Sequence, residues 1–80
     1  MTDSVDTARY RRFREILIEA RKSAGLSQTS LAEKLNRVQT FVSKYERGER
    51  RLDVVEFLDI ANALNIDPGE VLRQIQMIDA

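Results

Sequence analysis

The stretch "LSQTSLAEKLNRVQTFVSKYERGER", residues 26–50, decides the fold because it predicts two short helices joined by a turn. Ser27 precedes the first apolar residues and offers a hydroxyl that can cap a helix. Asn36 follows them, and asparagine tolerates the left-handed conformation in which helices end. Gly48 supplies the same conformation after the second segment. The stretch therefore predicts a helix, a turn and a helix in immediate succession.

The second of these helices, predicted over residues 38–47, divides into two faces when projected at about 100° per residue. Val38, Val42 and Tyr45 fall on one side, with Phe41 at the edge of this apolar stripe. A stripe so narrow buries little area, so the helix must be held mainly by its neighbours. The opposite face is free for another task and carries Gln39, Thr40, Ser43, Lys44 and Arg47.

Three further helices are predicted around this pair. Residues 7–24 carry apolar side chains at steps of three and four and end at Gly25. Asp53 and Glu56 form a capping box before a helix over 54–64. The motif "DPGE" starts the last helix with Asp67 as cap, Pro68 in the first turn and Glu70 reaching back. No segment alternates with a period of two, so we expect a single all-α domain over residues 1–80 with helices at 7–24, 28–35, 38–47, 54–64 and 68–78.

The composition excludes several classes of function. The chain has no cysteine and no histidine, which removes the usual zinc ligands, thiolate nucleophiles and histidine bases. Its carboxylates are scattered singly over helix caps and faces, so we expect no enzyme, no metal and no cofactor. No window has the roughly 18 apolar residues of a membrane span, and the first ten residues do not resemble a signal peptide. We therefore expect a cytoplasmic protein that makes no membrane contact.

The net charge of zero conceals an uneven distribution. Residues 9–51 hold twelve Lys or Arg against five Asp or Glu, whereas residues 53–79 hold one against six. A basic first half indicates a polyanionic partner, although charges also serve simply to solvate helix faces.

A set of residues at fixed spacing makes residues 26–50 similar to the phage repressor and Cro type of helix-turn-helix, the XRE family. They are Leu26, Ser27 and Gln28; Leu31 and Ala32; and Tyr45, Glu46, Arg47 and Gly48. The resemblance covers about residues 10–76 and implies a compact five-helix, lambda-repressor-like DNA-binding domain. The turn departs from the family pattern, because Asn36, Arg37 and Val38 stand where a glycine, an apolar residue and Ser or Pro are usual.

The resemblance implies a role for each residue of the pair. Gln28 would contact a phosphate and brace the next helix, unless it only satisfies exposed amides at a helix start. Gln39 would read a base, and Thr40, Ser43 and Lys44 would share base and backbone contacts; an ordinary solvated face is the alternative. These side chains are chemically suited to base edges in the major groove. Glu46 is expected to hold structure beside an arginine rather than to touch DNA, and Phe41 and Tyr45 are expected to lie in the core, with stacking on DNA as the alternative.

Arginines are the expected source of affinity for the sugar-phosphate backbone. Those predicted to clamp it are Arg37, Arg47, Arg50 and Arg51. On the first helix, either a phosphate contact or a solvated face is expected for Arg9, Arg11, Arg12 and Arg14.

The expected function is sequence-specific binding of double-stranded DNA by a transcriptional regulator, a repressor acting as a homodimer on an inverted repeat. Such a protein would associate with the nucleoid through DNA. The apolar residues of the last helix provide either a dimer surface or the rest of the core; they are Val71, Leu72, Ile75, Met77 and Ile78. The alternative is a protein-interaction module, such as an antitoxin or adaptor, that binds a protein partner through the acidic half.

Overall fold

Five helices and their connections form the part of the chain that the computed structural model describes, residues 7–78. The predicted all-α fold is confirmed, and each helix end lies within two residues of its predicted position. The domain and signal-peptide expectations include residues 1–6 and 79–80, which lie outside the described residues. The helices are α1 (Ala8–Ser23), α2 (Gln28–Lys34), α3 (Gln39–Glu46), α4 (Val54–Leu64) and α5 (Pro68–Gln76).

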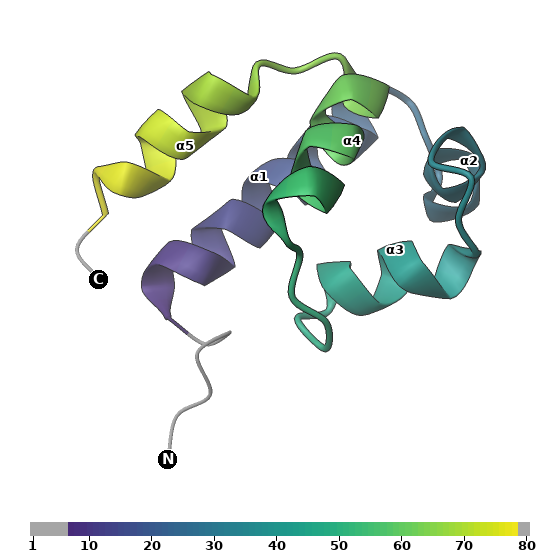
Figure 1. Cartoon of the computed structure of the whole chain (residues 1–80), viewed down its shortest axis with the longest axis horizontal. Helices are drawn as coiled ribbons and strands as arrows, with labels where there is room; N and C mark the ends of the chain where they lie inside the picture. Colours follow the sequence, from purple (N-terminus) through teal and green to yellow (C-terminus); the bar gives the residue numbers. More distant parts are fainter. Residues whose placement is uncertain (1–6, 79–80) are drawn as a thin grey trace.

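The helices are arranged around α1 and α4. In Figure 1, α2 and α3 lie together on one side of these two helices, and α5 lies on the other side along α1. The described helices include none that is both long and apolar enough to cross a lipid bilayer. α3 packs against α2, and on its other flank Phe41 lines a pocket together with Glu56 of the first turn of α4.

Short-range signals fix where the helices begin and end. Ser27 accepts a hydrogen bond from the backbone of Ser30, and Asp53 and Glu56 form the predicted capping box. Asn36 adopts a left-handed conformation with φ of 57°, which reverses the chain between α2 and α3. Gly48 does the same after α3 with φ of 80°. Of these local devices, the turn at Asn36 lies between α2 and α3, and the others mark where helices begin or end.

The core is formed by apolar side chains from all five helices. Leu17, Leu31, Val42, Tyr45 and Ile60 have no exposed surface. The aromatic rings of Phe13 and Phe57 meet edge to face, with centroids 5.1 Å apart, and join α1 to α4. Burial of side chains of this kind contributes about 1.5–3 kcal/mol each and holds the short α3 in place.

Two predictions about local structure are wrong. The helical projection places Val38 in the buried stripe of α3, but its side chain is 70% exposed and Phe41 is buried instead. The reason is that Val38 occupies the N-cap with extended backbone angles, so the helical projection begins only at Gln39. Glu70 does not reach back to its helix start as expected, and it accepts hydrogen bonds from Arg73 instead.

The apolar residues predicted on the last helix differ in burial. Val71 is in the core and Ile75 packs against it, whereas Leu72 is half exposed and Met77 is 86% exposed. Exposed valine and leucine side chains also occur on α4, at Val54, Val55 and Leu58.

Candidate nucleic-acid interface

The helix-turn-helix is held by backbone hydrogen bonds across its turn. The amide of Leu35 donates to the carbonyl of Leu31 over 3.0 Å, and that of Arg37 donates to Ala32 over 2.9 Å. The first continues the helical pattern, and the second closes the turn that Asn36 makes possible with its left-handed backbone. Because α3 follows directly, its orientation relative to α2 is set by the chain itself.

One face of α3 is open to solvent. Four of the side chains assigned to it from the sequence are exposed, and we call them the exposed α3 face: Gln39, Thr40, Lys44 and Arg47. This face carries an amide, a hydroxyl and two cations.

Ser43 is predicted on the same face, but it is buried, with 7% of its surface exposed. The side chain is short and lies one turn from both Gln39 and Arg47, whose longer side chains flank it. Its hydroxyl accepts a hydrogen bond from the Nη1 of Arg47. The position of Ser43 is therefore suited to holding Arg47 rather than to contacting a base.

A chain of hydrogen bonds connects the exposed α3 face to the protein interior, and we call it the amide chain: Gln39, Gln28, Glu46 and Arg21. The Nε2 of Gln39 donates to the Oε1 of Gln28 over 2.8 Å, and the Nε2 of Gln28 donates to the Oε1 of Glu46 over 2.9 Å. The amide chain thus fixes which polar atoms of both glutamines are used inside the protein.

The amide chain ends at a buried ion pair. The Nε of Arg21 donates to the Oε2 of Glu46 over 2.8 Å, and the two side chains are only 11% and 5% exposed. Arg21 also donates to the carbonyl of Leu26. The prediction that Glu46 holds structure by pairing with an arginine is confirmed. Arg21 itself was not predicted, because its only signal in the sequence is a cation among the last apolar residues of α1.

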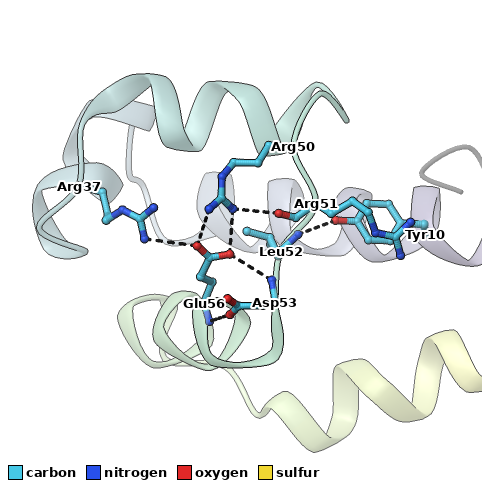
Figure 2. A network of polar contacts seen from close by, with 7 residues as sticks. All are labelled: Tyr10, Arg37, Arg50, Arg51, Leu52, Asp53 and Glu56. Carbon is cyan, nitrogen blue, oxygen red and sulfur yellow. Dashed lines mark hydrogen bonds and ion pairs between the residues drawn. The ribbon is translucent and has the colours of Figure 1, made fainter. Parts of the chain in front are cut away.

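The opposite flank of α3 carries a second cluster, the arginine cluster: Arg37, Arg50, Glu56 and Phe41. Arg50 forms two hydrogen bonds with the Glu56 carboxylate, over 2.8 and 2.7 Å, and Arg37 lies 3.5 Å from the same carboxylate. Figure 2 shows the two guanidinium groups approaching Glu56 from different segments of the chain. Both also lie over the ring of Phe41, at 3.9 Å for Arg37 and 4.9 Å for Arg50.

Electrostatics keep Glu56 ionised. The hydrogen bonds from Arg50 have the largest effect and, against partial burial, lower the pKa of Glu56 to about 2. The backbone amide of Asp53 and the charges of both arginines act in the same direction. The pKa of Arg50 is raised, mainly by the same hydrogen bonds. Glu56 is therefore a carboxylate at any physiological pH. The sequence indicated only its part in a capping box.

The remaining arginines differ in what they contact. Arg51 is exposed and lies 4.7 Å from the centre of the Tyr10 ring. On α1, Arg9 donates to the last carbonyls of α5, including that of Ile78 over 2.7 Å, and Arg14 donates to the carbonyl of Glu46. Arg9 and Arg14 therefore serve the fold, and neither lies on an open solvated face. The main polar surface beside α3 is then the exposed α3 face together with the arginines of the adjoining turns.

The sequence that contains α2 and α3 matches a known protein family. The family described as helix-turn-helix (HTH_3) matches residues 17–71, more than half of the chain. The chain belongs to the helix-turn-helix family. No curated protein matches the sequence.

Solved structures narrow down which helix-turn-helix proteins this chain resembles. An XRE-family like protein from Pseudomonas syringae pv. tomato str. DC3000 shares 46% identity and a TM-score of 0.83, over 86% of this chain and 84% of that one. The restriction-modification controller protein C.AhdI from Aeromonas hydrophila shares 38% identity and a TM-score of 0.69, over 75% and 87% of the two chains. The clp gene regulator ClgR from C. glutamicum, at 19% identity and a TM-score of 0.76 over 92% and 95%, shares the fold.

These relatives confirm the predicted resemblance to the XRE family. They establish the helix-turn-helix protein as a DNA-binding transcriptional regulator rather than an enzyme. The polar groups that the fold leaves exposed on α3 form the candidate DNA-binding surface.

Proposed function

We propose that α3 enters the major groove of a specific operator and that Gln39, Thr40 and Lys44 face the base edges. The observation that carries this proposal is the exposed α3 face, which combines an amide, a hydroxyl and an ammonium group on a helix otherwise packed into the core. The groove is about 12 Å wide and admits one helix. Glutamine suits adenine, lysine suits guanine, and the threonine methyl suits thymine.

Hydrogen bonds within the amide chain support Gln39 as the most specific reader. Its amide nitrogen donates to Gln28, which restricts the rotation of this exposed side chain. A side chain held in this way loses less conformational freedom when it binds. Gln28 braces Gln39 and, at the start of α2, faces a backbone phosphate.

Arginines on the two sides of α3 provide the sequence-independent part of binding. Arg47 and Arg51 are exposed, and Arg37 and Arg50, from the segments before and after α3, have side chains that are 41% and 38% exposed. Contacts from such side chains to phosphates release counterions and make binding depend on salt. Ser43, which is buried, contributes by holding Arg47.

Selection from a randomised duplex pool, followed by sequencing, tests this function. We expect the wild type to enrich one sequence, and Gln39→Ala to relax the preference at one position at a cost of about 1–3 kcal/mol. Gln74→Ala removes an exposed glutamine of α5 and serves as the matched control, with an unchanged preference. If the wild type enriches no sequence and its weak binding is abolished by salt, the proposed base readout is wrong.

The second part of the proposal is that the protein acts as a homodimer that represses transcription. Half-exposed Leu72 and the exposed Val54 border an apolar groove of about 350 Å³ between α1, α4 and α5, which a second copy could cover. Two copies related by a twofold axis would read half-sites about 34 Å apart in an inverted repeat. Such a dimer would block a promoter that overlaps its operator.

Sedimentation of the wild type beside Leu72→Asp tests the dimer, and a promoter reporter tests repression. We expect the wild type to sediment as a dimer and the variant as a folded monomer, with loss of repression in the reporter. A wild type that stays monomeric both alone and on the selected site would contradict the dimer. The exposed apolar residues would then favour the alternative of a protein partner bound by the acidic half.

A further inference from the structure

Two arginines share one carboxylate at the edge of α3. Arg37 comes from the turn before α3 and Arg50 from the segment after it, yet both approach the side chain of Glu56 on α4 (Figure 2). A single carboxylate neutralises only one of the two cations. The arginine cluster therefore keeps a net positive charge, and this charge lies beside the exposed α3 face.

Glu56 is itself fixed by the start of α4. Its backbone amide donates to the Oδ1 of Asp53 over 2.7 Å, and its Oε1 accepts from the backbone amide of Asp53 over 3.1 Å. The Glu56 side chain is only 14% exposed. The carboxylate is thus anchored by the helix cap and offers both arginines a partner whose position does not depend on DNA.

Both guanidinium groups retain surface and donors for another partner. Arg37 is 41% exposed and Arg50 is 38% exposed. Among residues 7–78, Arg50 donates three hydrogen bonds, two to Glu56 and one to the carbonyl of Arg51. A guanidinium has five N–H donors, so two of those on Arg50 remain. The ring of Phe41 lies against both groups and restricts their motion further.

We infer that Glu56 is a positioning residue that holds Arg37 and Arg50 in place to contact phosphates of the DNA backbone beside α3. The inference rests on the proposed function, because it requires α3 to lie in the major groove. Fixing a long arginine before binding lowers the entropy cost when it meets a phosphate. Glu56 touches no DNA in this arrangement and acts only through the two arginines.

Removal of the Glu56 charge should change DNA affinity in the direction opposite to the one that simple electrostatics predicts. A carboxylate near DNA repels phosphates, so removing its charge should strengthen binding if charge alone matters. Removing a positioning carboxylate should weaken binding, because the arginines are then no longer fixed in place. The two accounts therefore predict opposite shifts from the same substitution.

The variant Glu56→Gln separates the charge of Glu56 from its hydrogen bond with the backbone of Asp53. Glutamine at this position can still accept the backbone hydrogen bond of Asp53, so the capping box is retained while the ion pairs are removed. Asp59→Asn is the matched control. It removes the same charge one turn later on α4, from an exposed side chain that lines the same pocket as Arg37 and Glu56 but forms no ion pair among residues 7–78. Circular dichroism and thermal unfolding establish that both variants are folded.

Binding to the duplex selected by the wild type is measured at a series of salt concentrations. We expect Glu56→Gln to weaken binding by about tenfold, the contribution of one charge-assisted hydrogen bond. The slope of log affinity against log salt should fall by about 1 for each phosphate that the variant no longer neutralises. Asp59→Asn should bind as tightly as the wild type or more tightly. Equal or tighter binding by Glu56→Gln, with an unchanged slope, would overturn the inference.

A double-mutant cycle with Arg50→Ala separates positioning from general loss of structure. If Glu56 acts through Arg50, then Glu56→Gln should have a much smaller effect on affinity in the Arg50→Ala background. An undiminished effect in that background would contradict the assignment. Failure of the proposed function is distinguishable, because in that case the wild type itself selects no duplex.

Discussion

On one flank of α3, the amides of Gln39 and Gln28 lead to Glu46, a carboxylate that is almost fully buried and paired with Arg21. On the other flank, two arginines meet the carboxylate of Glu56 near the surface. The first flank ends in neutral, directional hydrogen-bonding groups, and the second ends in positive charge. Neutral amides suit base edges, and cations suit phosphates. The difference between the flanks indicates how one short helix can combine sequence readout with general affinity.

The two carboxylates also differ in what they contribute to stability. A buried ion pair is strongly destabilised when one partner is removed, because the other charge stays buried without compensation. A pair near the surface is replaced in part by water. The cost in unfolding free energy should therefore range from several kcal/mol for the loss of Glu46 to little for the loss of the Tyr45 hydroxyl.

Glu46→Ala is expected to cost about 3–5 kcal/mol of unfolding free energy, because it leaves the Arg21 guanidinium buried and unpaired. It also removes the acceptor of Gln28. Urea unfolding followed by circular dichroism measures the change. The control is the pair of substitutions Arg21→Met and Glu46→Leu together, which should recover most of the stability. A cost below about 1 kcal/mol for Glu46→Ala would show that this flank is not anchored by the ion pair.

Glu56→Gln is expected to cost only about 1–2 kcal/mol of unfolding free energy. Its arginine partners are more than one third exposed, so water replaces part of the interaction that they had with the carboxylate. The same urea titration measures this value beside that of Glu46→Ala. The contrast between the flanks fails if the two substitutions destabilise the protein equally.

Acid should remove the contribution of Glu56. Its pKa in the folded protein is about 2, below the ordinary value of 4.5. Stabilisation by Glu56 is therefore complete above about pH 4.5 and disappears as the pH falls towards 2. The charged groups that face it are Arg37, Arg50, Asp53 and Asp59. Unfolding measurements should find that the difference between wild type and Glu56→Gln shrinks between these pH values. A difference that stays constant would mean that Glu56 is not stabilised as a carboxylate.

Tyr45→Phe should have the smallest effect. The Tyr45 side chain is fully buried, its hydroxyl has no hydrogen-bond partner among residues 7–78, and burial raises its pKa. Removing this hydroxyl should leave stability unchanged or increase it by up to about 1 kcal/mol. Tyr10→Phe is the matched control, because the Tyr10 hydroxyl accepts a hydrogen bond from the amide of Leu52 and its removal should be destabilising. A substantial loss of stability in Tyr45→Phe would reveal a partner for that hydroxyl.

Local signals made most of the fold predictable from the sequence. Asn36, Gly48 and the capping box at Asp53 act on their own neighbours in the chain, so the sequence reveals them directly. The pairing of Glu46 followed from its place in the family pattern. Val38 was misplaced because the projection began one residue before the helix did. Val38 is exposed because it occupies the extended N-cap position, outside the helical residues of α3.

Long-range contacts account for the features that the sequence did not predict. Ser43 is buried although the projection places it on the polar face, and its hydroxyl accepts a hydrogen bond from Arg47. The partners Arg21 and Glu46 are 25 positions apart in the sequence, and Arg9 donates to the carbonyl of Ile78, 69 positions away. The meeting of Arg37 and Arg50 at Glu56 depends on how α4 packs beside α3. Periodicity within one helix carries no information on any of these contacts.

The central claim is that the amide flank sets sequence preference and the arginine flank sets affinity. Its most direct test is to measure binding of Gln39→Ala and Arg50→Ala to the selected duplex and to a scrambled duplex over a series of salt concentrations. We predict that Gln39→Ala reduces the ratio of the two affinities by about 1–3 kcal/mol and leaves the salt slope unchanged. Arg50→Ala should weaken binding to both duplexes alike and reduce the slope by about 1. If both substitutions change the ratio and the slope together, the two flanks do not have separate tasks and the claim is wrong.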